Sequence, residues 1–174
     1  MLDSFLPAAR RIAEALIARG ETLAVADGAT GGLISAALLA VPGASKFYRG
    51  GGVVYTFRAR NVLFALPQVA YEGMVSASEP YALLQARAIR DNFRADWGLA
   101  ETGASGGGSK HPLGIASGKS CAAAAGPGLE LARITETASD DRLANMEIFT
   151  LAALELMAGA LVGLGAEARL GDIT

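Results

Sequence analysis

Apolar residues recur at helical spacing at the start of the chain, and a short uncharged run follows them. Between residues 2 and 17 apolar side chains return every three or four positions, and Gly20 is a natural helix end. Asp3 or Ser4 can cap this helix at its beginning. Residues 22–26 are apolar and uncharged, which is typical of a buried strand. The pattern predicts a helix that leads directly into an internal strand.

Helices and strands continue to alternate through the middle of the chain. Residues 30–41 predict a helix that two glycines open, residues 52–56 predict a strand, and residues 58–66 predict another helix. The next helix ends near residue 93. Its cap is Ser76, through a capping box, or Ser78, because the following Pro80 is tolerated only in a first helical turn.

The second half predicts three more strands and a long final helix. The strands cover residues 97–102, 115–125 and 129–137, and the last two form a pair around a Gly-Pro-Gly turn. Residues 140–161 predict an amphipathic helix. The apolar residues on or near one face of this helix are Ile148, Leu151, Ala152, Leu154 and Leu156.

This order of elements indicates an α/β fold. Strands that alternate with helices and then give way to a strand pair predict a three-layer α/β/α sandwich with a mixed, mostly parallel sheet. The chain of 174 residues has no internal repeat and no linker, so we expect residues 1–174 to form a single domain.

Composition and charge narrow the classes of partner. Apolar residues make up 52% of the chain, so we expect a folded rather than a disordered chain, and the net charge of −2 gives no electrostatic reason to expect nucleic acid as a partner. No run of 18 uncharged apolar residues predicts a membrane span, and Asp3 and Arg10 interrupt any signal peptide. We therefore expect a cytoplasmic protein that acts on a small molecule.

The single cysteine and the single histidine argue against metal and thiol chemistry. Cys121 lies within the sequence SCAAAA, which favours a buried structural side chain over a nucleophile. One cysteine and one histidine cannot supply a structural zinc site, so no metal and no other cofactor is expected. His111 lies in a glycine-rich loop, where a solvated side chain is favoured over a catalytic one.

Three glycine-rich segments are possible anion sites. Residues 28–32 lie between a strand and a helix, where backbone N–H groups favour anions, although tight-turn packing explains these glycines equally well. Residues 102–108 follow a strand, where open α/β sheets bind ligands, and a plain surface loop is the alternative. Residues 114–120 look like a phosphate-binding P-loop, but the motif is one residue short and lies within a predicted strand.

Several short motifs occur together in a characteristic order. They read ADGATGGLI, PGASKFYRGGGVVYTFRAR, GMVS, ETGASGGGS, HPLGIA and SDDR. In this order and spacing the chain resembles the CinA carboxy-terminal domain, the nicotinamide-nucleotide amidohydrolase family, over about residues 21–154. Members of that family typically read AESCTGGLI, PGSS or PGAS, GGVVTYSNEAK, GAVS, VTGIAGPGG, KPVGTV and GDR at the matching places.

The resemblance implies a set of site residues. The reactive positions that it places on this chain are Ser45, Tyr55, Arg60 and Thr102. The substrate-binding positions are Thr30, Gly31, Gly32, Gly103, Ala104 and Arg142. The implied substrate is a nucleotide such as nicotinamide mononucleotide, whose carboxamide would be hydrolysed to the acid and ammonia. Self-association as a homodimer or larger oligomer is also expected, because the final helix is apolar, although burial within one chain explains that pattern equally well.

One reactive position departs from the family. Arg60 stands where the family has lysine, and a guanidinium has no accessible neutral form, so it cannot act as a general base. Losing a positioned base typically lowers a rate by about 10²–10⁴-fold. Lys46 is next to Ser45, but adjacent residues on a helix point about 100° apart. In the glycine turn the family's ESC is replaced by residues 27–29, Asp-Gly-Ala.

Three functions follow from these departures. The chain is an amidohydrolase of reduced activity toward nicotinamide mononucleotide, a nucleotide-binding or partner-binding relative without catalysis, or an enzyme for another amide or nucleotide. Ammonia release and calorimetric titration with mononucleotides distinguish them.

Overall fold

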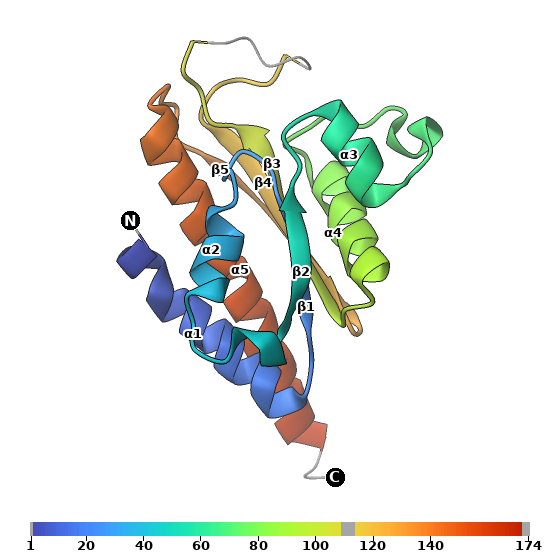
Figure 1. Ribbon diagram of the computed structural model, residues 1–174, viewed down its shortest axis with the longest axis vertical. Coiled ribbons are helices and arrows are strands. Elements are labelled where there is room, and N and C mark those ends of the chain that lie inside the picture. Colours follow the sequence, from blue (N-terminus) through green and yellow to red (C-terminus); the bar gives the residue numbers. More distant parts are fainter. Residues whose placement is uncertain (1, 109–113, 172–174) are drawn as a thin grey trace.

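A five-stranded sheet separates two layers of helices (Figure 1). The computed structural model describes residues 2–108 and 114–171, with side chains of the last helix up to residue 163. Helices α1, α2 and α5 cover one face of the sheet, and α3 and α4 cover the other. The α/β/α sandwich expected from the sequence is therefore confirmed.

The bounds of the elements follow the chain in a simple order. The helices are α1 (Leu2–Arg19), α2 (Leu33–Leu39), α3 (Phe57–Phe64), α4 (Glu79–Phe93) and α5 (Arg142–Gly171). The strands are β1 (Leu23–Asp27), β2 (Tyr48–Val53), β3 (Trp97–Ala104), β4 (Lys119–Gly126) and β5 (Leu129–Glu136). Two short 3₁₀ helices, η1 (Ala44–Lys46) and η2 (Gln68–Tyr71), lie in connections.

The sheet is mixed, with the strand order β2-β1-β3-β4-β5. Strand β1 pairs in parallel with both β2 and β3, whereas β4 pairs antiparallel with β3 and β5. The carboxyl ends of β1, β2 and β3 therefore meet at one edge of the sheet. Loops at this edge are where open α/β sheets bind ligands.

Two glycine-rich segments differ from the sequence-based prediction. Helix α2 begins at Leu33 rather than at residue 30, because Gly31 and Gly32 have left-handed φ values of 65° and 100° that an α-helix cannot contain. Strand β2 covers residues 48–53 rather than 52–56, so Tyr55 lies after the strand. Its glycines allow close pairing, because a Cβ on Gly51 would lie 2.2 Å from the Val25 carbonyl oxygen.

The final helix buries a different face from the predicted one. Ile148 and Leu151 are exposed, while Leu154 and Leu156 are buried against α1 and the sheet. The part of α5 from Arg142 to Gly163 is long and apolar enough to cross a membrane by composition alone. Half of the most apolar 18-residue window of this part is buried inside the fold, and a buried core helix meets the same criterion of length and composition.

Candidate functional site

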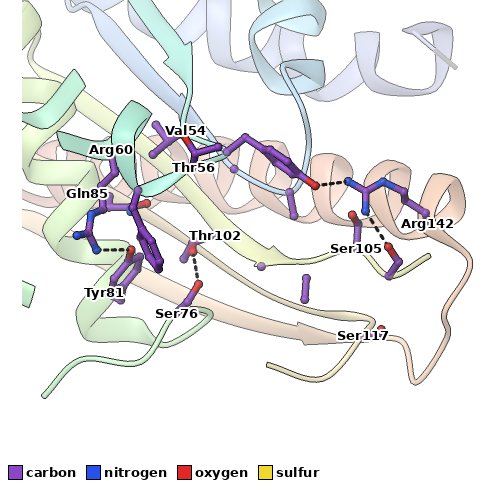
Figure 2. A pocket seen from close by; sticks show the side chains of 17 residues that line it. Val54, Thr56, Arg60, Ser76, Tyr81, Gln85, Thr102, Ser105, Ser117 and Arg142 are labelled. Atoms are coloured by element: carbon purple, nitrogen blue, oxygen red, sulfur yellow. Dashed lines mark hydrogen bonds between the residues drawn. The ribbon is translucent and has the colours of Figure 1, made fainter. Parts of the chain in front are cut away.

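A cavity of about 340 Å³ opens at the carboxyl ends of the parallel strands (Figure 2). The turn after β1, the segment after β2, the first turns of α3 and α4, and the end of β3 all contribute to its wall. The structure brings together six of the predicted site residues here: Tyr55, Arg60, Thr102, Gly103, Ala104 and Arg142. The cavity lies at the edge of the sheet where the order of strands predicts a ligand-binding site.

Ser45 is not among the residues that line this cavity. It lies exposed in η1, which precedes β2, whereas Tyr55 follows β2. A strand of six residues separates them, which corresponds to about 20 Å at the rise of an extended chain. The structure therefore does not join Ser45 to Tyr55 and Arg60, and Lys46 is exposed at the same distant end.

The part of the turn after β1 that follows Ala29 does not line the cavity, and its Thr30 binds two buried carboxylates. Thr30 donates its backbone N–H to Glu101 Oε2 over 3.0 Å and its hydroxyl to Asp27 Oδ1 over 2.9 Å. Thr30, Gly31 and Gly32 do not line the cavity, whereas Gly28 does. The polar groups of Thr30 are thus used inside the fold, and the turn holds β1 to β3.

Burial raises the pKa values of both carboxyl groups beneath the turn. The pKa of Glu101 is raised to about 6, although hydrogen bonds from Ser120 and Thr30 partly oppose the effect of burial. Burial also raises the pKa of Asp27, against hydrogen bonds from Ser35 and Thr30. No described lysine or arginine forms an ion pair with either group. Glu101 thus ionises near neutral pH in the folded protein.

Arg60 lies one turn into α3 and forms the buried end of the cavity. The Thr56 hydroxyl caps this helix by accepting from the Ala59 N–H over 3.1 Å, which fixes where α3 begins. Arg60 is only 5% exposed. Its Nη1 donates to Tyr81 Oη over 3.2 Å, and its Nη2 donates to Gln68 Oε1 over 3.2 Å.

The surroundings of Arg60 are aromatic and neutral. Its guanidinium carbon lies 3.8 Å from the centre of the Tyr71 ring and 5.0 Å from that of Phe57. Burial raises the pKa of Tyr71 to about 12, although Arg60 acts in the opposite direction, so this neighbour stays neutral. The described residues supply no carboxylate partner and no acceptor for Arg60 Nε. Arg60 is therefore a buried cation whose charge is not balanced.

Arg142 lies at the open end of the cavity. It is the first residue of α5, and its Nη1 donates to the Gly106 carbonyl over 2.7 Å. Its Nη2 donates to Tyr55 Oη over 3.1 Å, and both side chains are exposed. Figure 2 shows Arg60 and Arg142 at opposite sides of the view, with Thr102 and Ser76 between them.

The sequence-based prediction missed several polar residues of the wall, among them Ser76, Tyr81 and Gln85. Ser76 Oγ lies 2.9 Å from Thr102 Oγ1, and either hydroxyl can be the donor. The sequence predicts Ser76 or Ser78 as the cap of α4, and Ser78 occupies the N-cap position. Tyr81 and Gln85 are four residues apart on α4 and face the cavity together. The GMVS motif was the signal for Ser76, whereas nothing in the sequence distinguished the other two from core positions.

The described wall of the cavity is cationic and lacks a general base. Its ionisable side chains are two arginines and two tyrosines, and it contains no carboxylate, imidazole, amine or thiol. Arginine remains protonated in proteins and donates up to five hydrogen bonds in a planar fork. Such a wall can hold an anion. His111, for which the sequence favours a solvated over a catalytic role, lies outside the described residues.

The chain is similar to proteins named for competence and damage induction. The family model described as the CinA C-terminal domain matches residues 6–161. A CinA-like protein of Gloeobacter violaceus is 39% identical over 116 residues, which are 65% of this chain and 26% of that protein. A CinA-like protein of Myxococcus xanthus is 35% identical over 134 residues, which are 76% of this chain and 32% of that protein. The chain thus spans about a quarter to a third of these relatives.

Solved structures show the same fold. A CinA superfamily protein from Enterobacter cloacae superposes with a TM-score of 0.81 at 26% identity and covers 90% of this chain and 92% of its own. A competence or damage-inducible protein from Enterobacter asburiae gives a TM-score of 0.81 at 27% identity, with 90% and 98% coverage.

Proposed function

Given that the chain belongs to the CinA C-terminal domain family, we propose that it binds a mononucleotide in the cavity without efficient hydrolysis. The observation that carries the proposal is the make-up of the described wall, which has two guanidinium groups and no carboxylate. An anionic ligand complements such a wall electrostatically. A phosphate with an attached ribose and base also fits a cavity of about 340 Å³.

The lack of a proton acceptor argues against efficient turnover. Amide hydrolysis needs a group that takes a proton from a hydroxyl or from water at neutral pH. Arg60 occupies the position where the family has lysine, and arginine cannot accept that proton. Position 28, a serine in the family motif, is glycine here, and Ser45 lies away from the cavity. Three features that hydrolysis would use are thus absent from the described wall or replaced.

Hydrolysis of the nicotinamide mononucleotide carboxamide is the second candidate. The observation in its favour is that Tyr55 and Thr102, two of the reactive positions implied by the family resemblance, line the cavity together. The paired hydroxyls of Ser76 and Thr102 could also donate to a developing oxyanion. This candidate requires a base from outside the described wall.

Calorimetric titration combined with an ammonia assay tests the proposal. We expect saturable binding of nicotinamide mononucleotide or adenosine monophosphate at one site per chain, with ammonia release no faster than in buffer alone. The matching ribosides, which lack the phosphate, should bind more weakly. Ammonia release above background would establish the hydrolase instead, and failure of every mononucleotide to bind would refute both candidates.

Substituting Arg142 should weaken phosphate recognition moderately. We expect Arg142→Met to lower the affinity for adenosine monophosphate about 3- to 10-fold, because an exposed charged hydrogen bond contributes modestly. Arg10→Met serves as the control, since Arg10 is exposed on α1 and does not line the cavity. Equal affinities for the two variants would contradict a role for Arg142 at the mouth of the cavity.

A further inference from the structure

The buried charge of Arg60 requires a counterion that the described residues do not provide. Isolated charges inside proteins are costly, and they are normally paired with an opposite charge. The contacts of Arg60 are a tyrosine hydroxyl, an amide oxygen and two aromatic rings, and all of these groups are neutral. Its Nε–H has no acceptor among the described residues. Arg60 nevertheless lines a cavity that is open to solvent at another point.

The two ends of the cavity differ in their access to water. Arg142 and Tyr55 are exposed at the mouth, whereas Arg60 is buried at the inner end. A phosphate carries up to two charges and is costly to dehydrate, so it is best placed at the mouth. The inner end suits an anionic group smaller than phosphate that is attached to a planar ring, because the aromatic side chains of Phe57 and Tyr81 also line the cavity and can pack against such a ring.

We propose that the cavity prefers a mononucleotide whose base carries a carboxylate, held by Arg60, over the corresponding carboxamide. This proposal rests on the proposed mononucleotide-binding function and specifies its ligand class. The carboxylate would neutralise Arg60 and accept from its guanidinium, while the phosphate would remain beside Arg142. A neutral carboxamide leaves the charge of Arg60 unbalanced, and it offers one acceptor oxygen to the guanidinium where a carboxylate offers two. With arginine in place of the family's lysine, the inner end of the cavity thus recognises a carboxylate of the ligand instead of supplying a general base.

The first test compares two ligands that differ only in this group. Calorimetric titration of the unmodified protein with nicotinic acid mononucleotide and with nicotinamide mononucleotide should show about 10- to 100-fold tighter binding of the acid, as expected for one charge-assisted interaction in a buried site. Equal affinity, or tighter binding of the amide, would overturn the carboxylate proposal while leaving mononucleotide binding intact. If neither compound binds, the proposed function itself fails, and this inference fails with it.

The second test removes the charge at the inner end. Arg60→Met should lose most of the preference for the acid and should change the affinity for the amide much less. Arg58→Met is the matched control, because Arg58 is on the same helix, is exposed and does not line the cavity. Circular dichroism melting shows whether each variant folds. A folded Arg60→Met protein that keeps the full preference would assign the selectivity to another residue and would overturn the proposal.

Discussion

Replacing Gly28 by serine should lower the free energy of unfolding by about 3 kcal/mol, at the upper end of the cost of overpacking, because backbone atoms must move. A Cβ at this position would lie 2.3 Å from the Glu101 carbonyl oxygen and 3.1 Å from Thr102 Cα. The φ angle of Gly28 is not in the left-handed region, so the cost comes from the clash alone. Because Thr102 lines the cavity, mononucleotide affinity should fall as well.

Gly159→Ser provides the control for this substitution. Gly159 lies within α5, and no heavy atom is within 4 Å of a Cβ built there. Serine is a slightly better helix former than glycine, so this variant should be as stable as the parent or slightly more stable. Urea denaturation measures both variants. Equal stability of the two serine variants would show that β3 yields easily at Glu101 and would refute the close-packing argument.

We expect the difference in the free energy of unfolding between Glu101→Gln and the parent to depend on pH. This difference should favour the variant by about 2 kcal/mol more at pH 7.5 and above than at pH 4. The pKa of Glu101 is raised from its ordinary value of 4.5 to about 6 in the folded state, so the unfolded state loses this proton first. Stability from the protonated group is fully present below pH 4.5 and is lost as the pH rises through 6. A difference of about 1.5 in pKa corresponds to about 2 kcal/mol.

The comparison between variants isolates Glu101 from other titrating groups. Asp27 also has a raised pKa, whereas the pKa values of Glu130 and Asp140 are lowered, so the profile of the parent protein sums opposite trends. Urea denaturation from pH 4 to pH 8 should show a stability difference between Glu101→Gln and the parent that grows with pH. Glu14→Gln, at an exposed position of α1, should give a constant difference. A constant difference for Glu101→Gln would contradict the burial argument.

Apolar periodicity predicted most elements of this fold, because the helices bury one face and the central strands are uncharged. It failed at β2, where glycines that resemble a loop serve close strand pairing. It also failed for the exposed face of α5, since the helix is apolar on more than one side and only its packing against α1 and the sheet selects the buried one. Local sequence cannot report which of two apolar faces meets a neighbour.

The family motifs located most of the cavity wall but not its limits. Tyr55 and Arg60 follow β2 and Thr102 lies in β3, and the strand ends bring these two segments together. Ser45 is near Tyr55 in sequence, yet β2 carries the chain to the other end of the sheet between them. The sequence also could not reveal the unbalanced charge of Arg60, because that depends on the tertiary structure placing no described carboxylate beside it.

The close approach at Gly28 also has a consequence for the history of the site. A return of the family's serine to position 28 by one substitution would cost stability, because β3 occupies the space that its Cβ needs. A return of lysine to position 60 alone would supply an amine without that hydroxyl. Neither substitution by itself would therefore restore hydrolysis, so we expect relatives that have glycine at position 28 to have arginine at position 60 as well. The two positions should be inherited as a pair, and aligned sequences of such relatives would reveal that linkage.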